Sequence, residues 1–101
     1  MKPDMGIFTV INKNESKYFL QPTQNLKGMI NSTLFKLNGG IHPNKGLQED
    51  WLKLGCDGFE INILEKLEYD DDESKTDYTE ELELLKMIWV DRLTEKGVSF
   101  Y

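Results

Sequence analysis

The chain is 101 residues long, which is the size of one small domain. Apolar residues make up 39% of it, enough for one modest hydrophobic core. Its net charge of -6 argues against a nucleic-acid binder, because such proteins usually carry a basic excess that neutralises phosphates.

The sequence shows no pattern that predicts a targeting signal, a membrane span or an internal disulfide. No apolar run approaches the roughly 18 residues that a membrane span requires. The first residues, Met1 to Asp4, lack the basic and then apolar pattern of a signal peptide. The single cysteine, Cys56, cannot form an internal disulfide. We therefore expect one cytoplasmic domain spanning residues 1–101, without membrane contact.

The chain begins with the pattern of a β-hairpin. Residues 7–11 are β-branched or aromatic and predict a strand. Residues 12–16 supply turn-forming side chains, and residues 17–20 predict the partner strand. Pro22 is expected to end that strand, because proline has no main-chain N–H to donate.

Two helices are predicted next. In the first, apolar residues recur at helical spacing, Thr23 or Asn25 is a candidate N-cap, and residues 38–40 end the helix. Its stripe consists of Leu26, Ile30, Leu34 and Leu37. The second helix follows Asn44 and ends at Gly55, with Leu47, Trp51 and Leu54 on its buried side.

The C-terminal half predicts a strand, an acidic loop and a last helix. Residues 59–63 alternate apolar and polar side chains, as in a half-buried strand. The acidic run at residues 70–73 predicts a solvated loop, and Asp77 with Glu80 forms a candidate capping box. The last helix has a buried stripe that Leu84 and Ile88 are expected to widen. That stripe consists of Leu82, Leu85, Trp89 and Leu93.

The elements follow the order β-β-α-α-β-α. An antiparallel sheet with helices packed against it buries the apolar side of each element. The sequence therefore predicts an α+β fold with a small antiparallel three-stranded sheet flanked by helices.

This order and several motifs resemble the GIY-YIG nuclease family over nearly the whole chain. The motifs are Gly6-Ile7-Phe8, then Tyr18-Phe19-Leu20, and then the helix start Asn25-Leu26-Lys27-Gly28-Met29-Ile30. The segments at residues 42–51 and 54–65 are similar to the middle of small bacterial members. The resemblance implies the GIY-YIG fold.

The resemblance also implies a catalytic set, and most of it is replaced here. In the family, tyrosine helps to activate water, arginine steadies the phosphate charge, and glutamate holds a divalent cation. The first tyrosine corresponds to Phe8, and Tyr18 corresponds to the second. Met29 falls at the arginine position and Lys86 at the glutamate position.

These replacements lead us to expect no catalytic residues, no cofactor and no metal, with Phe8, Tyr18, Met29 and Lys86 as remnant positions. Leu20 replaces a motif glycine, so Leu20 and Met29 are expected to fill the former cleft with apolar side chains. If a metal binds at all, Glu83, three residues before Lys86, is the candidate ligand.

Three functions follow in order of preference. The first is a non-catalytic GIY-YIG-like domain that acts as a protein-binding or regulatory module. The second is a nucleic-acid-binding relic of an endonuclease, which requires the lysines to gather on one face. These are Lys17, Lys27, Lys36, Lys45 and Lys86. The third is a weak metal-dependent nuclease with a rearranged site using Tyr18 and Glu83.

Overall fold

The centre of the fold is β1 (Met5–Asn12), which pairs with a strand on each side. In the computed structural model, which describes residues 2–101, the sheet order is β3-β1-β2-β4. The other elements are β2 (Lys17–Thr23), α1 (Leu26–Gly39), α2 (Lys45–Leu54), the 3₁₀ turn η1 (Cys56–Gly58), β3 (Phe59–Leu67), α3 (Thr79–Glu95) and β4 (Ser99–Phe100). The α+β class is thereby confirmed.

The sheet differs from the sequence prediction in having four strands and mixed pairing. β1 pairs antiparallel with both β2 and β3, as expected. The fourth strand, β4, runs parallel to β2 and pairs Ser99 with Lys17 and Phe100 with Tyr18. A two-residue strand carries too little alternation to be recognised in sequence, and its place depends on the edge that β2 offers.

The prediction that Pro22 ends the second strand is wrong. β2 continues through Pro22 to Thr23, and Pro22 lies opposite Ile7 of β1. β4 covers β2 only at Lys17 and Tyr18, so β2 has a free edge at Pro22. Proline is tolerated in a strand where its missing N–H faces such an edge.

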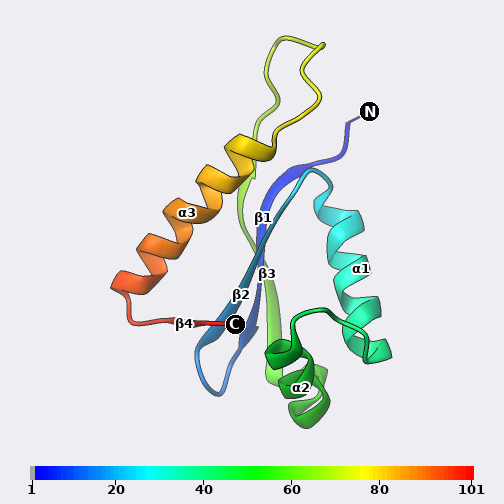
Figure 1. Cartoon of the computed structure of the whole chain (residues 1–101), viewed down its shortest axis with the longest axis vertical. Coiled ribbons are helices and arrows are strands. Elements are labelled where there is room, and N and C mark those ends of the chain that lie inside the picture. Colours follow the sequence, from blue (N-terminus) through cyan, green and yellow to red (C-terminus); the bar gives the residue numbers. More distant parts are fainter. Residues whose placement is uncertain (1) are drawn as a thin grey trace.

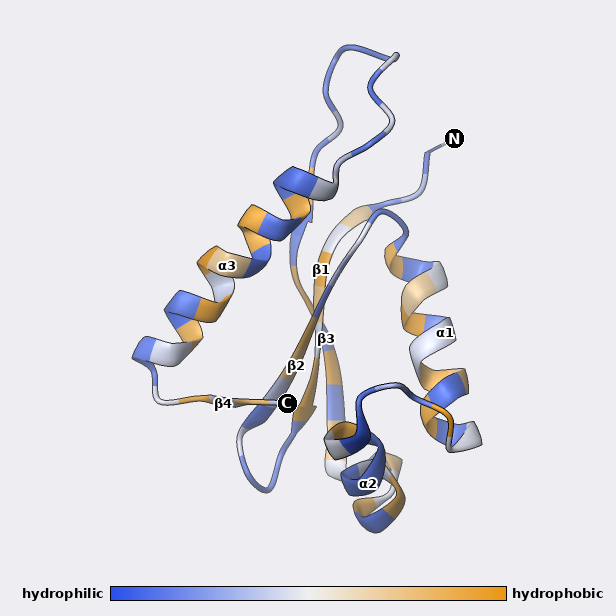
Figure 2. Ribbon diagram, viewed as in Figure 1, coloured by the Kyte–Doolittle hydropathy of each residue, from blue (hydrophilic) through white to orange (hydrophobic). Residues whose placement is uncertain are grey.

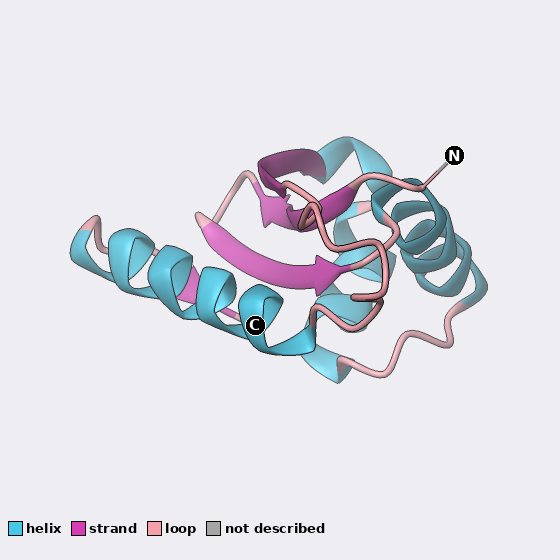
Figure 3. Cartoon of the chain, turned by 90° about the horizontal axis from the view of Figure 1, so that it is seen from above, coloured by secondary structure: helices cyan, strands magenta, loops and turns pink. Residues whose placement is uncertain are grey.

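Helices cover both faces of the sheet. α1 and α2 lie on one side and α3 lies on the other (Figure 1), and Figure 3 shows α3 separated from the other two helices by the sheet. Phe8 and Val10 of β1 pack with Leu37 and Trp51 on the first side. On the α3 side, Ile7 packs with Leu20, Leu85 and Leu93. Alternate side chains of β1 thus belong to two hydrophobic clusters, one on each face of the sheet.

The helix starts agree with the predictions for α1 and α2 but not for α3. The Asn25 side chain accepts from the Gly28 N–H, and the Asn44 side chain accepts from the Leu47 N–H. The predicted capping box of α3 is wrong, because Tyr78 is the N-cap residue. Asp77 instead accepts hydrogen bonds from the N–H and hydroxyl of Thr79.

The outer surface of α3 is more apolar than predicted. Leu84 and Ile88, expected to widen the buried stripe, are 58% and 47% exposed, and Met87 beside them is 62% exposed. A helix lying on a sheet buries only the side that faces it, and α3 has no second layer. The acidic loop that precedes α3 projects from the sheet and is hydrophilic throughout (Figure 2).

None of the helices within residues 2–101 combines the length and apolar content needed to cross a membrane.

Gly6 permits a close contact between β1 and β3. A Cβ atom at position 6 would lie 2.1 Å from the main-chain oxygen of Glu65 and 2.8 Å from the Cα atom of Lys66. The pairing shifts just beside this contact, because Ile7 lies opposite Glu65 whereas Phe8 lies opposite Ile63. Leu64 is therefore the extra residue of a β-bulge. A backbone oxygen cannot move aside as a flexible side chain can, so this position requires glycine.

Gly6→Ala should lower the free energy of unfolding by about 2–4 kcal/mol, because the added methyl group forces the two strands apart. Urea unfolding followed by tryptophan fluorescence measures this loss. Gly40→Ala is the matched control, since Gly40 has a φ of 75° but a methyl group added there would meet no atom within 4 Å beyond its own chain neighbours. It should cost only about 1 kcal/mol. Equal losses in the two variants would contradict the steric explanation.

Candidate functional site

The sheet separates the side chains that the family resemblance places together. Phe8 is fully buried among the residues packed under α1 and α2. Tyr18 lies opposite Ile11 and packs on the α3 side. Side chains alternate between faces along a strand, so in β2 it is Phe19, and not Tyr18, that shares the face of Phe8.

The other remnant positions divide in the same way. Met29 of α1 packs against the cluster that contains Phe8. Leu20 is 5% exposed and belongs to the cluster under α3, together with Tyr18. Lys86 of α3 is half-buried near Tyr18. Tyr18, Leu20 and Lys86 therefore come together, whereas Phe8 and Met29 lie across the sheet from them.

A cavity of about 310 Å³ lies where these three residues meet, at the outer edge of β2. Tyr18, Leu20 and Lys86 line it from the α3 side, with Val90. Phe19, Asn44 and the C-terminal residues Phe100 and Tyr101 complete it. The expectation that Leu20 fills this region with apolar atoms agrees with its burial, but Met29 does not line the cavity.

The C-terminal residues hold the cavity wall in place. The Tyr101 N–H donates to the Tyr18 carbonyl oxygen at 2.9 Å. The Tyr101 hydroxyl donates to Asp50 Oδ2 at 2.7 Å and accepts from Asn12 Nδ2 at 3.0 Å. Burial, and then the hydrogen bond to Asp50, raise the pKa of Tyr101 well above its usual range. The Lys17 ammonium lies 4.5 Å from the centre of the Tyr101 ring.

The donor set of the cavity does not fit the divalent cation that the family resemblance implies. Lys86 is the only residue of its lining with a charged side chain, and no Asp or Glu lines it. An ammonium repels a metal ion and has no lone pair to offer. Glu83, the candidate ligand, is exposed on α3 and is not part of the lining. Within residues 2–101, no three His, Cys, Asp or Glu side chains are placed to share a metal.

Two residues of this region were not expected from the sequence. Phe19 and His42 meet edge to face, with ring centres 5.3 Å apart. The His42 Nδ1 accepts from the Asn44 N–H at 3.0 Å, and burial together with the Lys36 charge lowers the pKa of His42. The register of the hairpin could have indicated Phe19 from the sequence. In this register, the residue eleven positions after Phe8 lies on the same face of the sheet as Phe8.

The fold is that of a GIY-YIG nuclease catalytic domain. The catalytic domain of homing endonuclease I-TevI superposes with a TM-score of 0.72 and 22% sequence identity, over 94% of this chain and 94% of that domain. A variant of the catalytic domain of intron endonuclease I-TevI superposes with a TM-score of 0.74 and 20% identity, over 97% of this chain and 92% of that one. No protein-family model and no curated protein sequence matches the chain.

Tyr101→Phe should lower the free energy of unfolding by about 1–2 kcal/mol near neutral pH, because Asp50 and Asn12 lose their shared hydroxyl partner. The raised pKa of Tyr101 means that its contribution is complete below the unfolded value of about 10 and declines as the pH rises above it. The gap between the wild type and the variant should therefore narrow above about pH 10.

Urea unfolding at several pH values measures both effects. Tyr18→Phe is the matched control, because the hydroxyl of Tyr18 has no side-chain hydrogen bond to another residue in the part of the chain that the structure describes. A Tyr101→Phe variant as stable as the wild type, or a gap that stays constant through this pH range, would count against the arrangement.

Proposed function

We propose that this chain is a non-catalytic GIY-YIG-like domain that acts by binding another protein. The observation that carries the proposal is the identity of the side chains at the former catalytic positions. Phe8 is buried without a hydroxyl, Met29 packs in the core, and Lys86 places a positive charge in the cavity. The fold is retained while the groups that activate water and hold a metal are absent from these positions.

The sheet geometry strengthens this argument for the pair of tyrosines. Phe8 and Phe19 are aromatic residues of the hairpin that share one face of the sheet, and neither carries a hydroxyl. Tyr18 does carry a hydroxyl, but its ring lies on the α3 side with Leu20. A general base contributes roughly 10²–10⁴ to rate and an electrostatic stabiliser about 10²–10³. Losing both, with the metal ligand, removes most of the rate enhancement.

Protein binding is supported by exposed apolar side chains on a small domain. Leu84, Met87 and Ile88 form an uncovered patch on α3, and Phe35 and Leu52 are 73% and 67% exposed on α1 and α2. Exposed apolar groups in contiguous sets are typical of surfaces that meet another protein. The net charge of -6 favours a partner with basic groups.

The nucleic-acid-binding alternative has less support. Lys17 and Lys86 lie near the cavity at the β2 edge. Lys27 instead lines a different cavity, beside Asp4 at the start of α1. A phosphate backbone is followed best by cations along one stripe, and these lysines lie at separate places.

The purified protein should show no cleavage of supercoiled plasmid with Mg²⁺ or Mn²⁺ above the level of a Lys86→Ala preparation. An agarose gel assay measures this, and a mobility shift at low salt with the same DNA should show no complex. Tyr18→Phe and Glu83→Gln are the decisive variants. Metal-dependent cleavage that either substitution abolishes would establish a rearranged nuclease site and overturn the proposal.

A further inference from the structure

We propose that the free edge of β3 at Phe59–Ile63 binds an extended, basic peptide segment of a partner protein, which adds a strand to the sheet and places apolar side chains in the groove under α1. This inference deepens the proposed function and rests on it. It assigns the binding surface to the sheet edge, whereas the apolar patch on α3 would suggest a helical partner.

The edge of β3 offers main-chain groups that no strand uses. β3 ends the sheet on one side, and among the described residues 2–101 its only strand neighbour is β1. The Gly58 carbonyl oxygen accepts from the Lys13 N–H at 3.1 Å, so Gly58 faces β1. In an antiparallel ladder, successive residues face alternate sides, which directs the main-chain groups of Ile61 and Ile63 away from β1. An added strand can bond to them.

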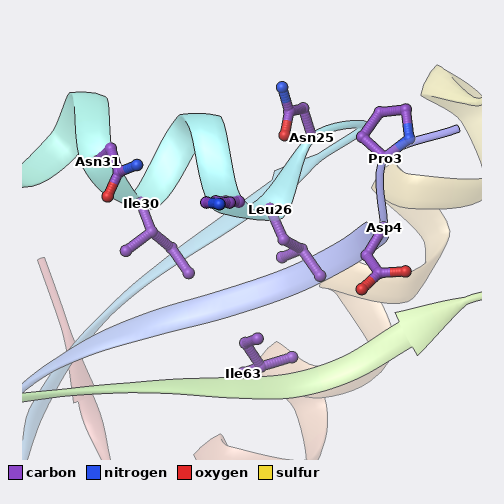
Figure 4. A pocket seen from close by; sticks show the side chains of 8 residues that line it. Pro3, Asp4, Asn25, Leu26, Ile30, Asn31 and Ile63 are labelled. Atoms are coloured by element: carbon purple, nitrogen blue, oxygen red, sulfur yellow. The ribbon is translucent and has the colours of Figure 1, made fainter. Parts of the chain in front are cut away.

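An apolar groove runs beside this edge. A cavity of about 450 Å³ lies between α1 and β3, where Leu26 and Ile30 of α1 point toward Ile63 of β3 (Figure 4). Ile63 is 47% exposed although it lies on the face that α1 covers. Pro3 closes one end of the groove, and Asp4 and Lys27 form its polar rim. Alternate side chains of an added strand would point into this groove.

The charge around the edge selects a basic segment. Two exposed carboxylates, Asp57 and Glu60, lie at the regular part of β3. Glu65 and Glu68 lie beyond the bulge, and Glu65 accepts from the Trp89 indole N–H. Lys66 is the one basic residue of β3, and its ammonium is paired with Asp4 at 3.2 Å. A segment that alternates apolar and basic side chains therefore complements both the groove and the carboxylates of Asp57 and Glu60.

The β-bulge makes a second copy of this chain a poor occupant. Leu64 interrupts the regular ladder after Ile63, which leaves five regular residues at Phe59–Ile63. Bulges and charges on an edge strand are the features that oppose pairing between like edges. Two copies would also bring Asp57 and Glu60 of each chain close to the same residues of the other. A flexible basic segment avoids both penalties.

A synthetic peptide of about seven residues, alternating valine and lysine and blocked at both ends, tests the inference with the full chain. Its addition to ¹⁵N-labelled protein should shift the amide signals of Ile61, Ile63 and Ile30, and should slow hydrogen exchange at Ile61 and Ile63. A peptide with the same side chains but N-methylated on alternate main-chain nitrogens should bind at least about tenfold more weakly, since it cannot complete the ladder. Glutamate in place of lysine should abolish binding.

Two protein variants with matched controls test the surface. Ile63→Lys should weaken peptide binding by about tenfold, and the control Leu84→Lys, at a similarly exposed apolar residue of α3, by less than about twofold. Glu60→Lys should weaken it about threefold, and more at low salt, whereas Glu83→Lys on α3 should have little effect. Circular dichroism and unfolding curves verify that all four variants are folded.

Several results would overturn the inference. They are no binding of the peptide, equal binding of its N-methylated form, or shifts centred on Leu84 and Met87. A concentration-dependent dimer in sedimentation that Ile63→Lys disrupts would assign the edge to a second copy instead. None of these results bears on the proposed loss of nuclease activity, which the cleavage test addresses. A protein that cleaves DNA would overturn the proposed function whether or not the peptide binds.

Discussion

The close approach of Gly6 to Glu65 sets the geometry on which the rest of this molecule depends. Gly6 has no side chain, and the main chain of β3 occupies the space that a side chain would need. β1 and β3 can therefore pair tightly at this end of the sheet. The bulge at Leu64 follows directly beside this contact. Beyond it, Ile61 and Ile63 face α1, while Leu64 packs with the cluster under α3 and Glu65 accepts from the Trp89 indole N–H at 3.0 Å. Gly6 thus permits the pairing and the bulge after which Ile63 faces α1 while Leu64 and Glu65 face α3.

The two faces of the sheet also explain why the positions that the family resemblance indicates do not form one site. Phe8 and Met29 belong to the core that α1 and α2 cover, and Tyr18, Leu20 and Lys86 line the cavity on the other side. A buried phenylalanine in a close-packed core contributes to stability through the area it removes from water. Position 8 therefore has a structural role that does not need a hydroxyl. The same reasoning applies to Leu20, whose burial stabilises the packing of α3.

Local patterns predicted most of the elements, and tertiary contacts decided the rest. Helical spacing was sufficient for α1 and α2, and of the two candidate caps of α1 the structure uses Asn25. β-branched and aromatic residues were sufficient for β1, and alternation was sufficient for β3. β4 could not be predicted, because a two-residue strand forms only where β2 leaves an edge free. The exposure of Leu84 and Ile88 was missed for a related reason: a helix pattern shows that a side is apolar but not whether anything covers it. For the site, the loss of catalytic chemistry stays a prediction from residue types, and the position of Tyr18 on the α3 side could be found only from the strand register.

The two edges of the sheet differ in what covers them, and this difference affects where a partner can bind. The β2 edge is covered by β4 at Lys17 and Tyr18, and this part is held by Tyr101, whose hydroxyl joins Asn12 of β1 to Asp50 of α2. Opening that part of the edge would cost the two hydrogen bonds of the Tyr101 hydroxyl, the bond from the Tyr101 N–H to Tyr18 and the pairing with β4. The β3 edge is uncovered by any strand, and its regular part lies beside an apolar groove. Within residues 2–101, a segment joining the sheet there displaces no other strand. This difference between the edges favours the β3 edge over the cavity as the place for the partner segment that we propose.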